Sequence, residues 1–272
     1  MHDVKRLNAA IEPVDYADWL KTAGIIFVFS GHFGYFFVED DRWWSVFGRF
    51  AAPVFFFLLG YARSRTVPPY WIWLGIALTL LESWNADWEW VAPNILLSFA
   101  LVRLVRPYTL MFLQAYGWIA FVLTATLLAA LAPLAGTWAD YGTEGWLWAL
   151  FGLCQRQYAD ANSANEGSSE VSAAAVQTLA PMRLAACLVA VMVYVWQEQQ
   201  EFSFAGIYFA VCVAGLALLS ILLCFFQRGP SGVQPPHAMG VVLRFVGRHT
   251  LEIYAIQLAG SELITLALDL DP

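Results

Sequence analysis

The chain has 272 residues, of which 60% are hydrophobic and only 13% are charged. A soluble domain carries about 25% charged residues, so this composition excludes an ordinary soluble protein. It predicts an all-α bundle of helices that span a lipid bilayer. The net charge of −7 argues against nucleic acid as a partner, because binding a phosphate backbone needs a positive field. The cysteines lie in apolar runs without the spacing of a zinc site, so we expect no metal.

Apolar stretches recur along the whole chain, and about 20 residues suffice for a helix to cross the hydrocarbon layer. We predict about nine spans, within a range of eight to ten, in a single transmembrane domain over residues 1–272. The spans are expected near residues 19–38, 43–62, 69–84, 92–106, 109–134, 145–156, 180–197, 203–227 and 250–268. Two stretches without a large apolar stripe, 157–179 and 228–240, are predicted to be flexible cytoplasmic loops.

The distribution of Lys and Arg predicts the orientation, because these residues gather on the cytoplasmic side of a membrane. With a cytoplasmic N-terminus, nearly all of them fall at inner ends of the predicted spans, and Arg42 and Arg49 are the exceptions. Acidic residues then collect at the outer ends. The sequence therefore predicts a multi-pass protein whose N-terminus is cytoplasmic.

Lys21 and His32 are ionisable residues in the first predicted span, where a charge is costly and therefore indicates function. They are 11 positions apart. That spacing is about 1100° of helical rotation, so both lie on one face, about 16 Å apart along the axis. It suits a long ligand such as a coenzyme A thioester, with phosphates near Lys21 and the acyl group at His32. Alternatively, His32 bonds to a neighbouring helix and Lys21 merely extends to the surface.

Other polar residues are predicted at a similar depth in the membrane. Arg49 lies about as far from the outer end of the second span as His32 does from that of the first, so the two can meet. Glu82, Asn85 and Asn94 lie near outer ends of the third and fourth spans. They are expected to pair with Arg49 or to line the path of an acceptor. A salt bridge that merely closes the bundle is the alternative.

Five segments, in the same order along the chain, are familiar from one group of membrane enzymes. They are DWLK…GHFGYFF (18–37), GRFAAPVFFFLLGY (48–61), PNILLSFAL (93–101), DYGTEG (140–145) and RHTLEIYAIQL (248–258). With these segments the chain resembles the TraX branch of the acyltransferase-3 superfamily of integral-membrane acyltransferases. Related enzymes often have His where this chain has Gln257, and an acid where it has Gly31. His32 therefore needs an orienting partner from Ser30, from the partners of Arg49 or from another helix.

The resemblance implies an acetyltransferase of the bacterial inner membrane. Its donor would be cytosolic acetyl-CoA, and its acceptor an extracytoplasmic group such as the N-terminal amine of a conjugative pilin or an envelope glycan. His32 is expected to act as general base, or as a nucleophile that forms acetyl-His, and Arg49 to steady the oxyanion or orient the acceptor.

The remaining candidate residues divide between the two substrates. Candidates for the phosphates of acetyl-CoA are Lys21, Arg63, Arg65, Arg103, Arg106 and Arg248, and candidates for the acceptor are Glu82, Asn94, Asp140 and Tyr141. Glu252 and Tyr254, expected near the inner face, would tune the donor site. Two other classes stay open: a transporter or channel with a path along Lys21, His32 and Arg49, and a non-catalytic scaffold of a pilus or envelope assembly.

Overall fold

The structure is a computed structural model that describes residues 13–38, 41–64, 66–165 and 170–268. Helices account for most of these residues, and the only β-type pairing in the described part is an isolated bridge between Asp15 and Pro230. This confirms the predicted all-α fold. The helices are α2 (Tyr16–Phe37), α3 (Arg42–Gly48), α4 (Ala51–Tyr61), α5 (Pro69–Asn85), α6 (Ile95–Ala135), α7 (Gly142–Asn165), α8 (Glu170–Phe202), α9 (Ile207–Cys224), α10 (His237–Arg248) and α11 (Thr250–Leu268).

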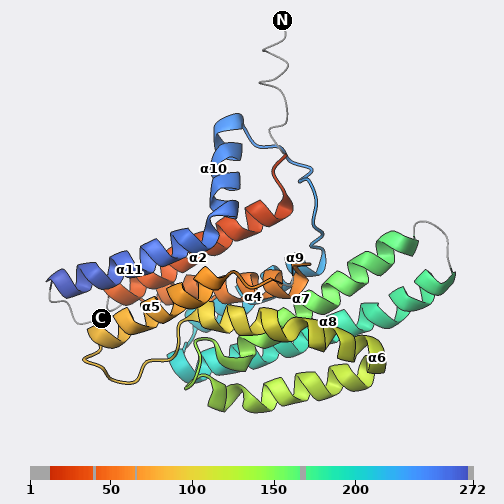
Figure 1. Cartoon of the computed structure of the whole chain (residues 1–272), viewed down its shortest axis with the longest axis horizontal. Helices are drawn as coiled ribbons and strands as arrows, with labels where there is room; N and C mark the ends of the chain where they lie inside the picture. Colours follow the sequence, from red (N-terminus) through yellow and green to blue (C-terminus); the bar gives the residue numbers. More distant parts are fainter. Residues whose placement is uncertain (1–12, 39–40, 65, 166–169, 269–272) are drawn as a thin grey trace, which may run out of the picture.

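Most helices run side by side along the long axis of the molecule, and α10 stands across them (Figure 1). Helices α4 and α7 form the centre. Gly60 of α4 contacts the backbone of Ala149, and Gly152 of α7 contacts the backbone of Phe57, so closely that a Cβ would clash at either glycine. Small residues at a helix crossing let two backbones approach, which replaces the hydrophobic driving force that is missing in lipid.

Six helical segments of the described chain are long and apolar enough to cross a membrane. They are Tyr16–Phe37, Arg42–Tyr61, Ile95–Ala135, Ala173–Phe202, Ile207–Cys224 and Thr250–Leu268. The predicted count of about nine is therefore not supported by length and composition. The predicted spans 69–84 and 145–156 correspond to α5 and α7. Helix α5 has only 17 residues, and α7, which is enclosed by other helices, carries Glu144 and Arg156 among its buried residues.

The predicted spans 92–106 and 109–134 fall in one helical stretch, α6, of 41 residues. The predicted boundary between these two spans, at 107–108, is wrong, because the helix continues through Pro107 and reverses direction at Gly117 (Figure 1). Gly117 has φ 52° and ψ −122°, a conformation that disfavours any residue with a Cβ. A proline often only kinks a helix, which continues beyond it. A glycine with a positive φ, such as Gly117, can end the helix and reverse the chain.

The two predicted loops are also partly helical. Within 157–179, residues 157–165 extend α7 and residues 170–179 begin α8, while 166–169 lie outside the described residues. Residues 173–175 are all alanine, the residue type with the highest helix propensity. They form a helix although the low sequence complexity suggested a loop. Within 228–240, the irregular chain ends at Pro236 and α10 begins at His237.

Candidate active site

His32 and Arg49 both line a small central cavity of about 60 Å³. Each follows a glycine, and these glycines are in contact: a methyl group at Gly48 would lie 2.6 Å from Cα of Gly31. The close approach of α2 and α3 brings the next residues of both helices to one place. It also gives a steric reason for a glycine at position 31, because a side chain there would meet Gly48.

Gln257 of α11 orients the imidazole of His32. Its Oε1 lies 2.5 Å from Nδ1 of His32, and its Nε2 donates to Oγ of Ser261 at 3.2 Å. An amide oxygen only accepts, so Nδ1 carries the proton and a neutral imidazole keeps its lone pair on Nε2. The orienting partner thus comes from another helix, one of the three sources that the sequence left open.

Arg49 is held from several sides. Its Nη1 lies 3.2 Å from Oε2 of Glu198, and both side chains are largely buried. Its guanidinium also lies 4.3 Å from the ring centre of Phe202 and 5.8 Å from that of Tyr141. The backbone oxygen of Arg49 accepts a hydrogen bond from the Tyr194 hydroxyl at 2.8 Å. The expected pairing with Glu82, Asn85 or Asn94 is replaced by the ion pair with Glu198 on α8.

A cavity of about 540 Å³, called the outer cavity because it lies at the predicted outer ends of the helices, adjoins the central one and is strongly acidic. Its acidic lining residues are Glu82, Asp140, Glu144, Glu198, Glu201 and Glu262. Two of these carboxylates are satisfied by amide donors. Asn94 donates to Glu82 at 3.0 Å, and Asn85 donates to Glu262. Asn94 itself is buried beneath this surface and bonds the hydroxyl of Tyr254 at 3.0 Å, so it supports the cavity without lining it.

Asp140 and Tyr141 lie at the junction of the central and outer cavities. A tight turn presents them, in which Tyr141 has φ 57°, a costly conformation for a residue with a large side chain. The turn is fixed to the start of α6, because Ser98 Oγ donates to the Asp140 backbone oxygen at 3.2 Å. Burial raises the pKa of the Asp140 carboxyl to about 6, while the guanidinium of Arg49 acts in the opposite direction.

A cavity of about 370 Å³, called the inner cavity because it lies at the predicted inner ends of the helices, is on the other side of the central one and is basic. Its cationic lining residues are Lys21, Arg63, Arg103, Arg228 and Arg248. Lys21 Nζ donates to the backbone oxygen of Gly247 at 2.8 Å, and the Arg103 guanidinium lies 4.4 Å from the ring centre of Trp71. Two other cations of this cavity are paired with carboxylates, Arg228 with Asp15 at 3.6 Å and Arg63 with Asp160.

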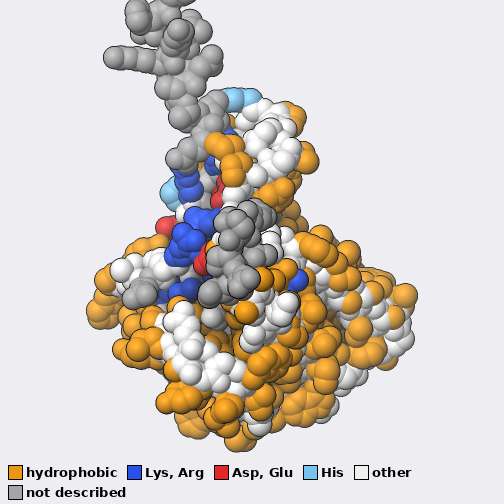
Figure 2. Space-filling model, turned by 90° about the vertical axis from the view of Figure 1, so that its right-hand side faces the viewer, with side chains coloured by type: hydrophobic (Ala, Val, Ile, Leu, Met, Phe, Trp, Pro, Cys, Tyr) orange, Lys and Arg blue, Asp and Glu red, His pale blue; other side chains and the backbone are white. Residues whose placement is uncertain are grey.

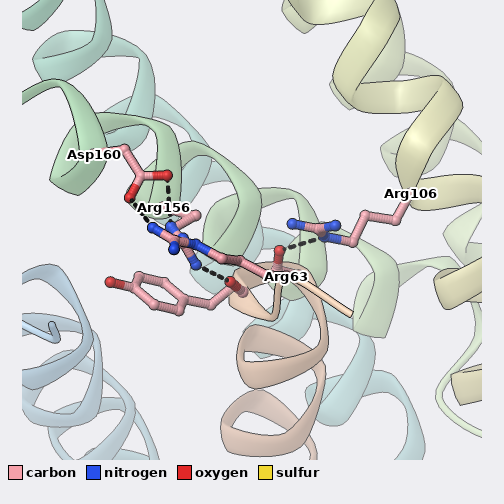
Figure 3. A network of polar contacts seen from close by, with 6 residues as sticks. Arg63, Arg106, Arg156 and Asp160 are labelled. Atoms are coloured by element: carbon pink, nitrogen blue, oxygen red, sulfur yellow. Dashed lines mark hydrogen bonds and ion pairs between the residues drawn. The ribbon is translucent and has the colours of Figure 1, made fainter. Parts of the chain in front are cut away.

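Figure 3 shows why Arg63 and Arg106, both predicted at the donor site, have different surroundings. Arg106 and Arg156 approach the C-terminal end of α4, where Arg106 donates to the Gly60 oxygen at 2.8 Å and Arg156 to that of Tyr61 at 3.2 Å. Arg63, just beyond this end, pairs with Asp160 at 3.2 Å and lines the inner cavity. Arg106 instead lines a separate apolar cavity. Arg65 lies outside the described residues.

The three cavities form a series through the bundle. Phe55, Phe99 and Leu251 line both the inner and the central cavity, and His32 and Arg49 line both the central and the outer one. The rings of Phe55 and Phe99, whose centroids are 6.4 Å apart, are in contact where the inner and central cavities adjoin. The basic and the acidic cavity therefore lie on opposite sides of the central cavity that His32 lines.

Sequence reasoning missed several residues of the site. Tyr254 was expected near the inner face, but its ring centre lies 5.9 Å from that of His32. Gln257 and Glu198 were not assigned to the site, although both lie in or beside apolar runs, where polar groups need a partner. Their position in apolar runs indicates that each needs a polar partner, but the sequence does not identify that partner. Glu144, which lines the outer cavity, has an oxygen without a hydrogen-bond partner.

Comparisons with protein-family models, with curated proteins and with solved structures gave no match.

Proposed function

We propose that the protein is a membrane acyltransferase of the TraX type that moves an acetyl group from acetyl-CoA to an acceptor at the acidic end of the bundle. The observation that carries this proposal is the series of cavities that joins a basic chamber to an acidic one, with His32 at the junction. A scaffold has no need of such a series of cavities. The opposite charges of the two end cavities suit two different substrates.

The basic chamber is the proposed donor site. Coenzyme A is anionic at its phosphate end and carries the thioester at the far end of a narrow arm. Lys21, Arg228 and Arg248 line the inner cavity, and Lys21 and His32 lie on one face of α2, about 16 Å apart along its axis. The phosphates would dock at these cations, and the arm that carries the thioester would reach His32 only after the touching rings of Phe55 and Phe99 move aside.

In the proposed reaction, a neutral amine or a hydroxyl of the acceptor attacks the thioester carbonyl. Nε2 of His32 takes the proton of the attacking group, the C–S bond breaks, and the proton passes to the leaving thiolate. The products are an amide or ester and the free thiol. Arg49 would stabilise the developing oxyanion. A route through acetyl-His32 would use the same nitrogen, because Nδ1 is taken up by Gln257.

The acceptor is proposed to be extracytoplasmic, either the N-terminal amine of a pilin or an envelope glycan, and the membrane to be the bacterial inner membrane. We further infer that α5, α7 and both halves of α6 cross the membrane with the other spans, and that the N-terminus and the basic chamber face the cytoplasm.

The test is acetyl transfer from labelled acetyl-CoA by the purified protein, together with binding of acetyl-CoA measured as a shift in Tm. His32→Ala should abolish transfer yet retain the Tm shift, because the phosphates bind elsewhere. His249→Ala, a change at an exposed histidine, is the matched control and should keep full activity. Full activity in His32→Ala would remove the base, and a protein that acetyl-CoA does not stabilise would be a transporter or a scaffold instead.

Gln257→Leu tests the orientation of the imidazole. We expect a fall in kcat of about tenfold to a hundredfold with an unchanged KM for acetyl-CoA, since a mispositioned base slows the chemical step alone. Gln257→Glu, which restores an acceptor for Nδ1, should recover part of the rate. An unchanged kcat in Gln257→Leu would show that His32 needs no such partner.

A further inference from the structure

Helix α10 differs from its neighbours in direction and in composition. It stands across α2 and α11 (Figure 1), and only His249 separates it from α11. Since α11 is apolar enough to cross a membrane, a helix set across it at one end lies along the membrane surface. The position of α10 is therefore that of an interfacial helix.

One face of α10 is apolar and exposed. Met239, Val242 and Phe245, which recur every third residue, have 45%, 56% and 57% of their surfaces exposed. A soluble surface rarely places such residues in one row, so this face needs a cover. The described part of the chain offers none, because α10 packs on α2 through a different face.

The packed face is made by small residues. Gly247 contacts Asp18 so closely that a Cβ would clash with its carboxylate, and Gly240 lies near Val14. Leu243, between them, is buried. These contacts fix the rotation of α10 about its axis, so that the row of Met239, Val242 and Phe245 cannot turn inward.

A cationic edge adjoins the apolar row. His237, Arg244 and Arg248 share one stripe of α10. Lys21 and Arg228 lie with the two arginines at one surface pocket, where these four cations outnumber two carboxylates, Asp15 and Asp18. Figure 2 shows Lys and Arg side chains gathered on this part of the molecule, above a bundle whose surface is mainly apolar. An exposed apolar row beside cations is the pattern of a helix that lies in the headgroup layer of an anionic membrane.

We propose that α10 binds the membrane surface, with its apolar row among the acyl chains and its cationic edge on the phosphates of anionic phospholipids. The occupant is the bilayer rather than a protein, because the row continues the lipid-facing apolar surface and its charged border is complementary to anionic headgroups. An apolar face of this kind is buried about 5–10 Å into the boundary between headgroups and acyl chains. The proposal is independent of the acyltransferase function.

The test places a nitroxide label at Val242→Cys in the full-length protein, reconstituted in nanodiscs of phosphatidylcholine with or without phosphatidylglycerol. Power saturation compares collisions with oxygen, which enters the bilayer, and with a water-soluble nickel complex. We expect a several-fold excess of oxygen collisions. A label at Ser163→Cys, an exposed residue of α7, is the control and should show the reverse. The signal of the equally treated parent protein, which has native cysteines, is subtracted.

Phosphatidylglycerol should increase the protection from nickel at Val242→Cys, and Arg244→Gln should remove this increase while leaving the Tm within a few degrees. Nickel collisions as frequent as at Ser163→Cys would overturn the proposal. Protection from both reagents with dipolar broadening would overturn it too, because a second copy would then cover α10. Protection that does not depend on phosphatidylglycerol would refute the role of the cationic edge and assign the contact to the apolar row alone.

Discussion

The basic and acidic ends of the cavity series hold their charges in different ways. At the basic end, Lys21 and Arg103 contact a backbone carbonyl and an aromatic ring, and the nearby ion pairs of Arg228 with Asp15 and of Arg63 with Asp160 are partly or largely exposed. At the acidic end, Glu82 is bonded by an amide, and Glu198 is paired with Arg49 deep in the bundle. The charge pairs of the basic end are thus accessible to solvent, whereas much of the acidic end also holds the helices together. Substitutions at the two ends should differ accordingly.

The largest effect is expected for Glu198→Gln, which leaves the buried guanidinium of Arg49 without its carboxylate. Breaking a buried ion pair on one side costs about 3–5 kcal/mol, so the Tm in detergent should fall markedly. Glu201→Gln changes a nearby exposed acid of the same cavity and should leave the Tm almost unchanged. The double variant Arg49→Met with Glu198→Met should regain stability. Equal losses at Glu198 and Glu201 would contradict a structural role of the ion pair.

Gly48→Ala tests the contact that brings His32 and Arg49 together. The added methyl group would lie 2.6 Å from Cα of Gly31 and would push α2 and α3 apart. We expect a loss of about 1–3 kcal/mol from overpacking and a fall in kcat of at least tenfold. Gly260→Ala in α11, where nothing lies within 4 Å of the new Cβ, is the control and should be neutral or slightly stabilising. Normal kcat in Gly48→Ala would separate the glycine contact from catalysis.

At the basic end, Lys21→Glu should raise the apparent KM for acetyl-CoA steeply with a small change in Tm. Arg106→Met should lower the Tm instead and leave the KM as it is, because Arg106 donates to the Gly60 oxygen and lies outside the inner cavity. Its loss should cost about 1–3 kcal/mol of stability. Kinetics and thermal unfolding of both variants separate the roles. An unchanged KM in Lys21→Glu would transfer phosphate binding to the arginines of the inner cavity.

The smallest effect concerns Asp140. The unfolded chain ionises this residue near its ordinary pKa of 3.8, whereas the folded protein keeps the proton until about pH 6. The folded state binds more protons within this window, so its stability falls as the pH rises through it and stays lower above it. Asp140→Asn should therefore raise the Tm at neutral pH by a few degrees and have no effect below about pH 3, where the carboxyl is protonated in both states. A gain that is independent of pH would show that the charge of Asp140 is not its cause.

Features that depend on one helix were predictable from the sequence, and features that depend on two helices mostly were not. The shared face of Lys21 and His32 follows from the helical period alone. The partner of Arg49 could not be predicted, because Glu198 is distant in sequence and equivalent in type to several other acids. In the sequence, Gln257 stood out only because enzymes of the resembling family often have a histidine at this position. The packing of α11 on α2 is needed to show that Gln257 contacts His32.

The fold shows the same limit. The apolar stretches locate most helices, but composition could not place the reversal of α6, which depends on the backbone conformation of Gly117. It also could not anticipate that α7, with its buried polar groups, lies in the centre, since a helix shielded by others need not be apolar. The helical continuation of α7 and α8 beyond the bundle was hidden by small and polar residues.

In the proposed acyltransferase, the contacting rings of Phe55 and Phe99 between the inner and central cavities would limit the range of donors. A two-carbon group occupies little more room than the sulfur that carries it, whereas each further methylene would have to displace an aromatic side chain that packs against its neighbours. Discrimination between short and long thioesters would then be steric and would reside in these rings, some distance from the atoms that react.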